Sequence, residues 1–82
     1  MKIINSKTHN IICEIRGGDN LVTKHPKKGS EITDIYLKSV NLPLRKIKSE
    51  PTEHDANEFI SVIQESFGKF NSLTIEFEFP HV

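Results

Sequence analysis

The sequence predicts a small α+β domain in which an antiparallel sheet of about four or five strands carries one amphipathic helix, about residues 53–67, on one face. Three observations indicate this fold. Apolar residues recur with helical spacing after residue 53, apolar and polar residues alternate after residue 72, and shorter alternating segments bounded by Gly, Pro and Asx residues fill the first 50 positions. A chain of 82 residues suits a single domain, residues 1–82.

The N-terminal part is predicted to form two short strands, residues 2–6 and 11–16, joined by a turn at 8–10. In the second strand, alternate side chains should face the core, namely Ile11, Cys13 and Ile15. The motif Gly17-Gly18-Asp19-Asn20 then favours a hairpin reversal, because glycine and Asx residues tolerate positive φ. The next strand should therefore return over residues 21–24.

Residues 31–42 fit two patterns. Ile32, Ile35, Tyr36 and Val40 make an acceptable helical stripe, whereas Ile35 and Leu37 alternate with polar neighbours as in a strand. The β-branched setting favours the strand. A bend at 41–43, which contains a proline, should lead to an extended segment at 44–48.

The helix is predicted from one apolar stripe, formed by Ala56, Phe59, Ile60, Ile63 and Phe67. Pro51 and Thr52 suit its first positions, and Gly68 can adopt the left-handed conformation that ends a helix. The turn at 71–72 should lead into the last strand.

The C-terminal strand is predicted from a strict alternation. Its apolar face consists of Leu73, Ile75, Phe77 and Phe79, and its polar face of Thr74, Glu76 and Glu78. Because the apolar face is the most hydrophobic of any predicted strand, we expect this strand to be central or well paired. As an edge strand it would instead invite dimerisation or pairing with a partner's strand.

Catalytic and metal chemistry find little support. Cys13 is the single cysteine, which excludes an internal disulfide, and its inward position favours an inert thiol. The four histidines, His9, His25, His54 and His81, lack metal-ligand spacing. We therefore expect no enzymatic activity, no cofactor and no metal site. No apolar run approaches the roughly 18 residues of a membrane span, and no signal peptide is evident, so a cytoplasmic protein is expected.

Charge is sorted along the chain. Residues 24–48 carry seven bases and two acids, a net of +5, whereas residues 50–82 carry seven acids and one base, a net of −6. The acidic region offers a candidate partner-binding set of Glu53, Asp55, Glu58, Glu65, Glu76 and Glu78. The basic region offers a second set of Lys24, Lys27, Lys28, Arg45, Lys46 and Lys48.

The favoured interpretation is a non-enzymatic protein-binding module. Its most concrete form is a small inhibitor or neutraliser of bacterial or phage origin, of the immunity or anti-defence type. Such a protein would block a basic nuclease or nucleic-acid-handling enzyme with the acidic helix and strand.

Two alternatives stay open. A nucleic-acid-associated regulator could use the basic region, although Tyr36 is the one aromatic residue there that could stack on bases. A homo-oligomeric subunit, such as a homodimer, could bring the oppositely charged regions of two copies together.

Overall fold

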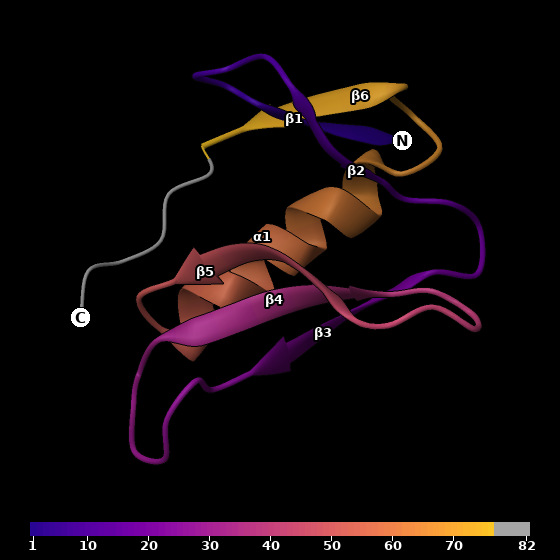
Figure 1. Ribbon diagram of the computed structural model, residues 1–82. Coiled ribbons are helices and arrows are strands. Elements are labelled where there is room, and N and C mark those ends of the chain that lie inside the picture. Colours follow the sequence, from indigo (N-terminus) through magenta and orange to yellow (C-terminus); the bar gives the residue numbers. More distant parts are fainter. Residues whose placement is uncertain (77–82) are drawn as a thin grey trace.

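The computed structural model describes residues 1–76 and confirms the α+β class, with six strands and one helix in this part of the chain (Figure 1). The elements are β1 (Lys2–Asn5), β2 (Ile11–Glu14), β3 (Asn20–Lys24), β4 (Thr33–Lys38), β5 (Arg45–Glu50), α1 (Glu53–Ser66) and β6 (Ser72–Ile75). No helix among residues 1–76 is long and apolar enough to cross a membrane.

The strands form two sheets where one sheet of four or five strands was predicted. Sheet A has the order β2-β1-β6, and sheet B is the antiparallel series β3-β4-β5. The predicted hairpin at residues 17–20 is therefore wrong. Since β2 pairs with β1 and β3 pairs with β4, this turn carries the chain from sheet A to sheet B, with Gly18 at a φ of 90°.

The core is one cluster to which both sheets and the helix contribute. Figure 1 shows α1 running between the two sheets, and α1 contacts β4 and β5. The buried residues are Ile3, Cys13, Ile15, Ile35, Leu37, Ile47, Ala56 and Ile63. Each large apolar side chain in such a cluster contributes roughly 1.5–3 kcal/mol through burial.

Both ends of α1 are fixed by capping interactions. Thr52 is the N-cap, and its Oγ1 accepts a hydrogen bond of 3.2 Å from the backbone N–H of Asp55. At the other end the N–H of Phe67 donates to the Ile63 carbonyl, and Gly68 follows with a φ of 87°. Phe67 was predicted to belong to the buried stripe, but at this cap position it is 41% exposed.

The ambiguous segment 31–42 contains strand β4. Ile35 and Leu37 are buried, whereas Tyr36 is half-buried and Lys38 is exposed, as the strand alternative predicts. The predicted bend at 41–43 includes Asn41 with a φ of 62°. Leu44, the first residue of the predicted extended segment, precedes β5.

The prediction that Ile11 faces the core is wrong. Ile3 pairs with Cys13 but Ile4 pairs with Ile11, so Ile12 is an extra residue that breaks the alternation. Cys13 is buried as predicted, whereas Ile11 is 56% exposed.

The C-terminal strand is an edge strand rather than a central one. Within residues 1–76, β6 pairs with β1 alone, and this pairing is parallel. In the order β2-β1-β6 the central strand is β1, and β6 lies at one edge of sheet A. Leu73 and Ile75 are half-buried and Thr74 is exposed, which confirms the alternation in the described part. Phe77, Glu78 and Phe79 lie outside the described residues.

Candidate binding surfaces

The exposed side of α1 brings together two of the predicted acidic residues. At about 100° per residue, Glu58 and Glu65 point away from the buried Ala56 and Ile63. Val62 lies between them at i+4 from Glu58 and i−3 from Glu65, and it is 49% exposed. We call Glu58, Val62 and Glu65 the acidic ridge.

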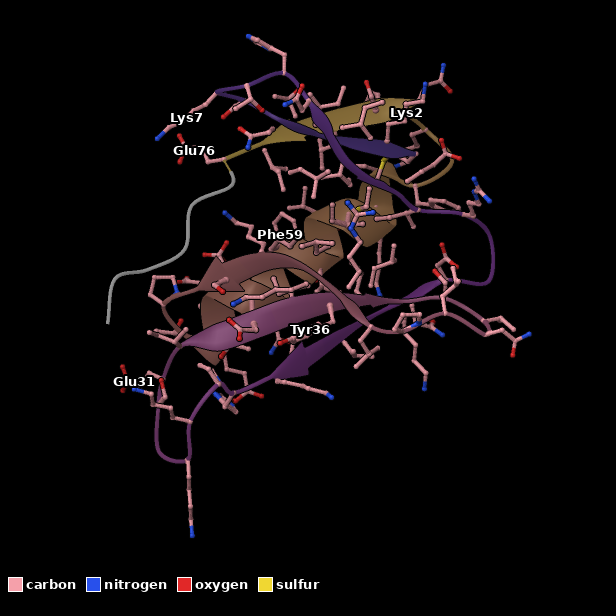
Figure 2. The ribbon with its side chains drawn as sticks, in the orientation of Figure 1. Lys2, Lys7, Glu31, Tyr36, Phe59 and Glu76 are labelled. Atoms are coloured by element: carbon pink, nitrogen blue, oxygen red, sulfur yellow. The ribbon has the colours of Figure 1, made fainter. Side chains whose placement is uncertain are left out.

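The other predicted acidic residues lie elsewhere. Glu53 and Asp55 occupy the first turn of α1, where carboxylates complement the positive end of the helix dipole. Glu76 follows β6 and lies at the same end of sheet A as Lys7 (Figure 2), where the Ser6 N–H bonds to the Ile75 carbonyl. Glu78 falls outside the described residues.

The predicted basic residues are divided by a β-bulge. Ile35 pairs with Lys48 but Tyr36 pairs with Lys46, which leaves Ile47 as an extra residue in β5. Without a bulge, Lys46 and Lys48 would share a face, because they are two residues apart in a strand. With it, Lys48 shares the helix side of sheet B with Ile35, and Lys46 lies on the opposite side.

Lys48 is an internal link rather than part of a basic surface. Its side chain is only 14% exposed, and its Nζ lies 3.2 Å from Glu50 Oε1. The same Nζ donates a 2.7 Å hydrogen bond to the Glu76 carbonyl and lies 5.7 Å from the centroid of the Phe59 ring. Lys48 therefore connects β5, α1 and the end of β6.

Among residues 1–76, no helix or second sheet packs on the opposite side of sheet B, and this side is basic. In Figure 1, β4 and β5 pass in front of α1, so the viewer sees the side of sheet B away from the helix. The strand register places Tyr36 on this side, opposite Val22 on β3 and Lys46 on β5. We call this surface the outer face of sheet B; its residues are Asn20, Val22, Lys24, Asp34, Tyr36, Lys38, Lys46 and Ser49.

The one acidic side chain on the outer face of sheet B is held within a polar cluster. Asp34 is 4% exposed and accepts a hydrogen bond from the Ser49 hydroxyl. Its second carboxylate oxygen lies 3.5 Å from Lys46 Nζ. The carboxylate is thus satisfied inside the sheet and contributes little negative charge to the exposed surface.

The other predicted bases lie beside this face or on the opposite side of the sheet. Lys27 and Lys28 are exposed in the loop between β3 and β4, which His25 Nδ1 closes at 3.1 Å from the Ile32 carbonyl oxygen. Arg45 pairs with the buried Leu37 and therefore points to the opposite side of the sheet. Lys38 was not among the predicted site residues, although its alternation with Tyr36 was a usable signal.

A groove of about 980 Å³ lies between the end of β2, the turn at 17–19 and the β4–β5 loop. Cys13 and Leu37 are buried residues that line it, and the exposed Val40 and Leu42 lie at its rim. Arg45 also lines the groove, so it combines apolar walls with positive charge.

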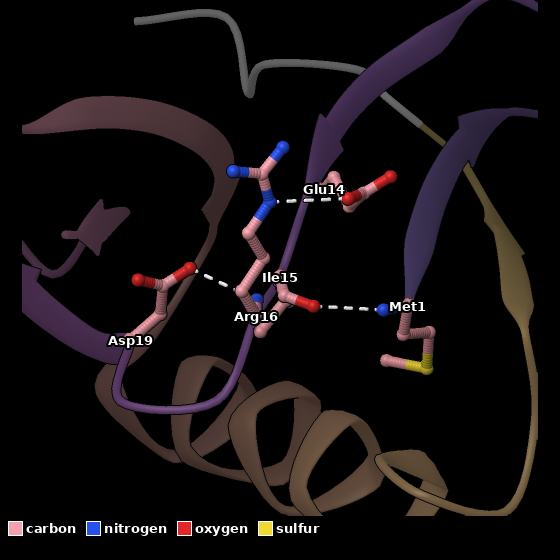
Figure 3. A network of polar contacts seen from close by, with 5 residues as sticks. All are labelled: Met1, Glu14, Ile15, Arg16 and Asp19. Atoms are coloured by element: carbon pink, nitrogen blue, oxygen red, sulfur yellow. Dashed lines mark hydrogen bonds and ion pairs between the residues drawn. The ribbon is translucent and has the colours of Figure 1, made fainter.

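A network of polar contacts fixes the turn beside this groove (Figure 3). The N-terminal ammonium of Met1 donates a hydrogen bond of 2.7 Å to the Ile15 carbonyl. Asp19 Oδ2 accepts a hydrogen bond of 2.9 Å from the Arg16 backbone N–H, and Arg16 Nε donates one of 3.1 Å to Glu14 Oε1. The Arg16 side chain is 78% exposed, so this ion pair contributes little to stability.

Burial raises the pKa of the Cys13 thiol, and the Arg45 charge only partly opposes this effect. In the unfolded chain the thiol ionises at an ordinary pKa, about 8.5, while in the folded chain it stays protonated to a higher pH. The free energy of unfolding should therefore fall as the pH rises above about 8.5. Urea unfolding on either side of that pH checks this, with Cys13→Ala as control. An equal pH dependence in both proteins would contradict it.

No protein-family model matches the chain, and neither the curated proteins nor the solved structures contain a match.

Proposed function

We propose that this protein is a non-enzymatic protein-binding module that docks on a basic partner through the acidic ridge of α1. The observation that carries the proposal is Val62, which is 49% exposed between Glu58 and Glu65. An apolar side chain surrounded by charge is the usual arrangement of a docking surface, because the apolar group is desolvated on binding while the charged rim steers the encounter.

Part of the interface has to come from residues outside the acidic ridge. A stable interface covers about 800 Å² on each partner, which is more than one helix ridge provides. Phe67 and Phe70 are 41% and 60% exposed just beyond the end of the helix. Phe67 lines a pocket with the buried Ile63 and so lies on the side of α1 opposite the ridge. Aromatic side chains are enriched among the residues that dominate binding energy, which makes Phe70 the candidate for an additional anchor.

The acidic ridge favours a partner with a positively charged surface. Nucleases and other enzymes that act on nucleic acids carry such surfaces to attract phosphates. A rigid helix that presents carboxylates would occupy that surface and exclude the substrate. We therefore propose that the protein is of bacterial or phage origin and acts as an inhibitor or neutraliser of such an enzyme.

The experiment compares two variants with the same change in net charge. Glu58→Lys/Glu65→Lys reverses the acidic ridge, while Glu14→Lys/Glu31→Lys reverses two exposed acids on β2 and in the β3–β4 loop. Each protein is immobilised and tested for capture of purified basic nucleases and for inhibition of their activity.

The wild type and the β2/loop variant should bind and inhibit one of these enzymes, and the ridge variant should bind at least tenfold more weakly, a loss of about 1.4 kcal/mol. Equal loss in both variants would show that net charge alone drives binding. Retention of binding by the ridge variant would exclude α1 as the docking surface.

A further inference from the structure

We propose that the outer face of sheet B binds single-stranded nucleic acid, with a base stacked on Tyr36 and phosphates held by Lys24 and Lys38. This activity is separate from the proposed protein docking, because it uses the opposite side of sheet B from α1. Either proposal can therefore fail without the other.

The position of Tyr36 suits a stacking platform. It lies on β4, the central strand of sheet B, and its neighbours on both sides belong to the same open face. Lys24 Nζ lies 5.8 Å from the centroid of the Tyr36 ring, so a cation already occupies the ring surface in the free protein. A base can replace that ammonium group, which then becomes available for a phosphate.

Positive charge lies on both sides of this ring. Lys38 is two residues from Tyr36 on the same strand and face, about 7 Å along β4, and Lys24 lies on the neighbouring strand. Both side chains belong to exposed residues, and neither makes an ion pair within residues 1–76. Lys27 and Lys28 extend the basic surface at the end of the same β3–β4 hairpin.

Among the described residues, 1–76, little negative charge lies on the contact surface. Asp34 is buried with its carboxylate held by Ser49 and Lys46, and the acidic ridge belongs to the helix on the other side of the sheet. A polyanion can therefore approach this face without meeting an exposed carboxylate at its centre. A planar ring between lysines favours single strands, whose bases are free to stack, over duplexes.

The sequence provides an internal reporter for this interaction. Tyr36 is the single tyrosine and the chain has no tryptophan, so intrinsic fluorescence reports on Tyr36 alone. Titration with a 20-nucleotide oligo(dT) should quench this fluorescence. With two phosphate contacts, from Lys24 and Lys38, each contributing roughly 0.7 to the logarithmic salt slope, affinity should fall about 7-fold between 50 and 200 mM salt.

Two double variants with the same change in net charge test whether the oligonucleotide binds to the outer face of sheet B. Lys24→Gln/Lys38→Gln removes two charges from the outer face, and Lys2→Gln/Lys69→Gln removes two exposed charges elsewhere. The first pair should reduce the salt slope by about 1.4 and weaken binding at least tenfold at low salt, while the second should change binding less than threefold.

The stacking role is tested with a fluorescein-labelled oligo(dT) and anisotropy, since these variants lose the tyrosine signal. Tyr36→Leu should weaken binding about tenfold, and Tyr36→Phe should retain it because the ring is kept. Circular dichroism first confirms that each variant is folded; if Tyr36→Leu unfolds, the quenching titration and the lysine pairs decide alone.

Three results would overturn the proposal. The first is the absence of Tyr36 quenching at low salt. The second is equal weakening in the two lysine pairs, which would reduce the effect to net charge. The third is equal quenching by a poly-glutamate peptide or by duplex DNA, which would assign the face to acidic proteins or to duplexes instead.

Discussion

Replacing Ile63 with aspartate is expected to unfold the domain. Ile63 is 2% exposed and lies in the core cluster shared by α1 and both sheets. Losing its burial costs about 2–5 kcal/mol, and placing a carboxylate without a partner there costs several more. A chain of 82 residues has a total stability of only about 4–12 kcal/mol. Far-UV circular dichroism of the variant should show loss of the helix and sheet signal.

Ser61→Asp provides the matched control, because it adds the same charge to an exposed position of the same helix. Its free energy of unfolding should stay within about 0.5 kcal/mol of wild type. A folded Ile63→Asp protein with a wild-type urea midpoint would show that α1 does not pack through this residue.

Replacing Lys48 with methionine is expected to cost about 2 kcal/mol. Methionine keeps the apolar stem but removes the charge that pairs with Glu50 and the donor to the Glu76 carbonyl. Glu50 is then left largely buried without its cation, which is the costly part of breaking such a pair. For a domain of this size the melting temperature should fall by roughly 10 °C.

Lys38→Met is the control for Lys48, because it removes an exposed lysine of the same sheet and should leave stability within about 0.5 kcal/mol of wild type. Hydrogen exchange adds a local readout. The Ser6 N–H, which bonds to the Ile75 carbonyl at 2.8 Å, should exchange faster in Lys48→Met if Lys48 holds the end of β6. Equal melting temperatures for the two lysine variants would remove Lys48 from any linking role.

The two proposals give the sorted charge of the chain a spatial meaning. The acidic third contributes Glu58 and Glu65 to the exposed side of α1, and the basic middle contributes Lys24 and Lys38 to the far side of sheet B. The two charged surfaces are separated by the sheet and its core, so the two proposed partners would not compete for one surface.

The sequence alone determined the features that depend on neighbouring residues. Thr52 and Gly68 define the ends of α1, because a cap needs only the few backbone groups beside it. The alternation of Ile35 and Leu37 with Tyr36 and Lys38 likewise predicted both the strand and its two faces. The same local patterns identified the acidic side of the helix as a candidate binding site.

Only the tertiary structure decided which strands pair and which distant side chains share a face. An alternating strand such as β6 fits an edge or a central position equally well, and its parallel pairing with β1 depends on contacts about 70 residues apart in the chain. The two bulges, at Ile12 and Ile47, arise from pairing with a neighbouring strand and leave no local pattern. The bulge at Ile47 places Lys48 inside the fold and Lys46 outside, because one extra residue reverses every later side chain of a strand.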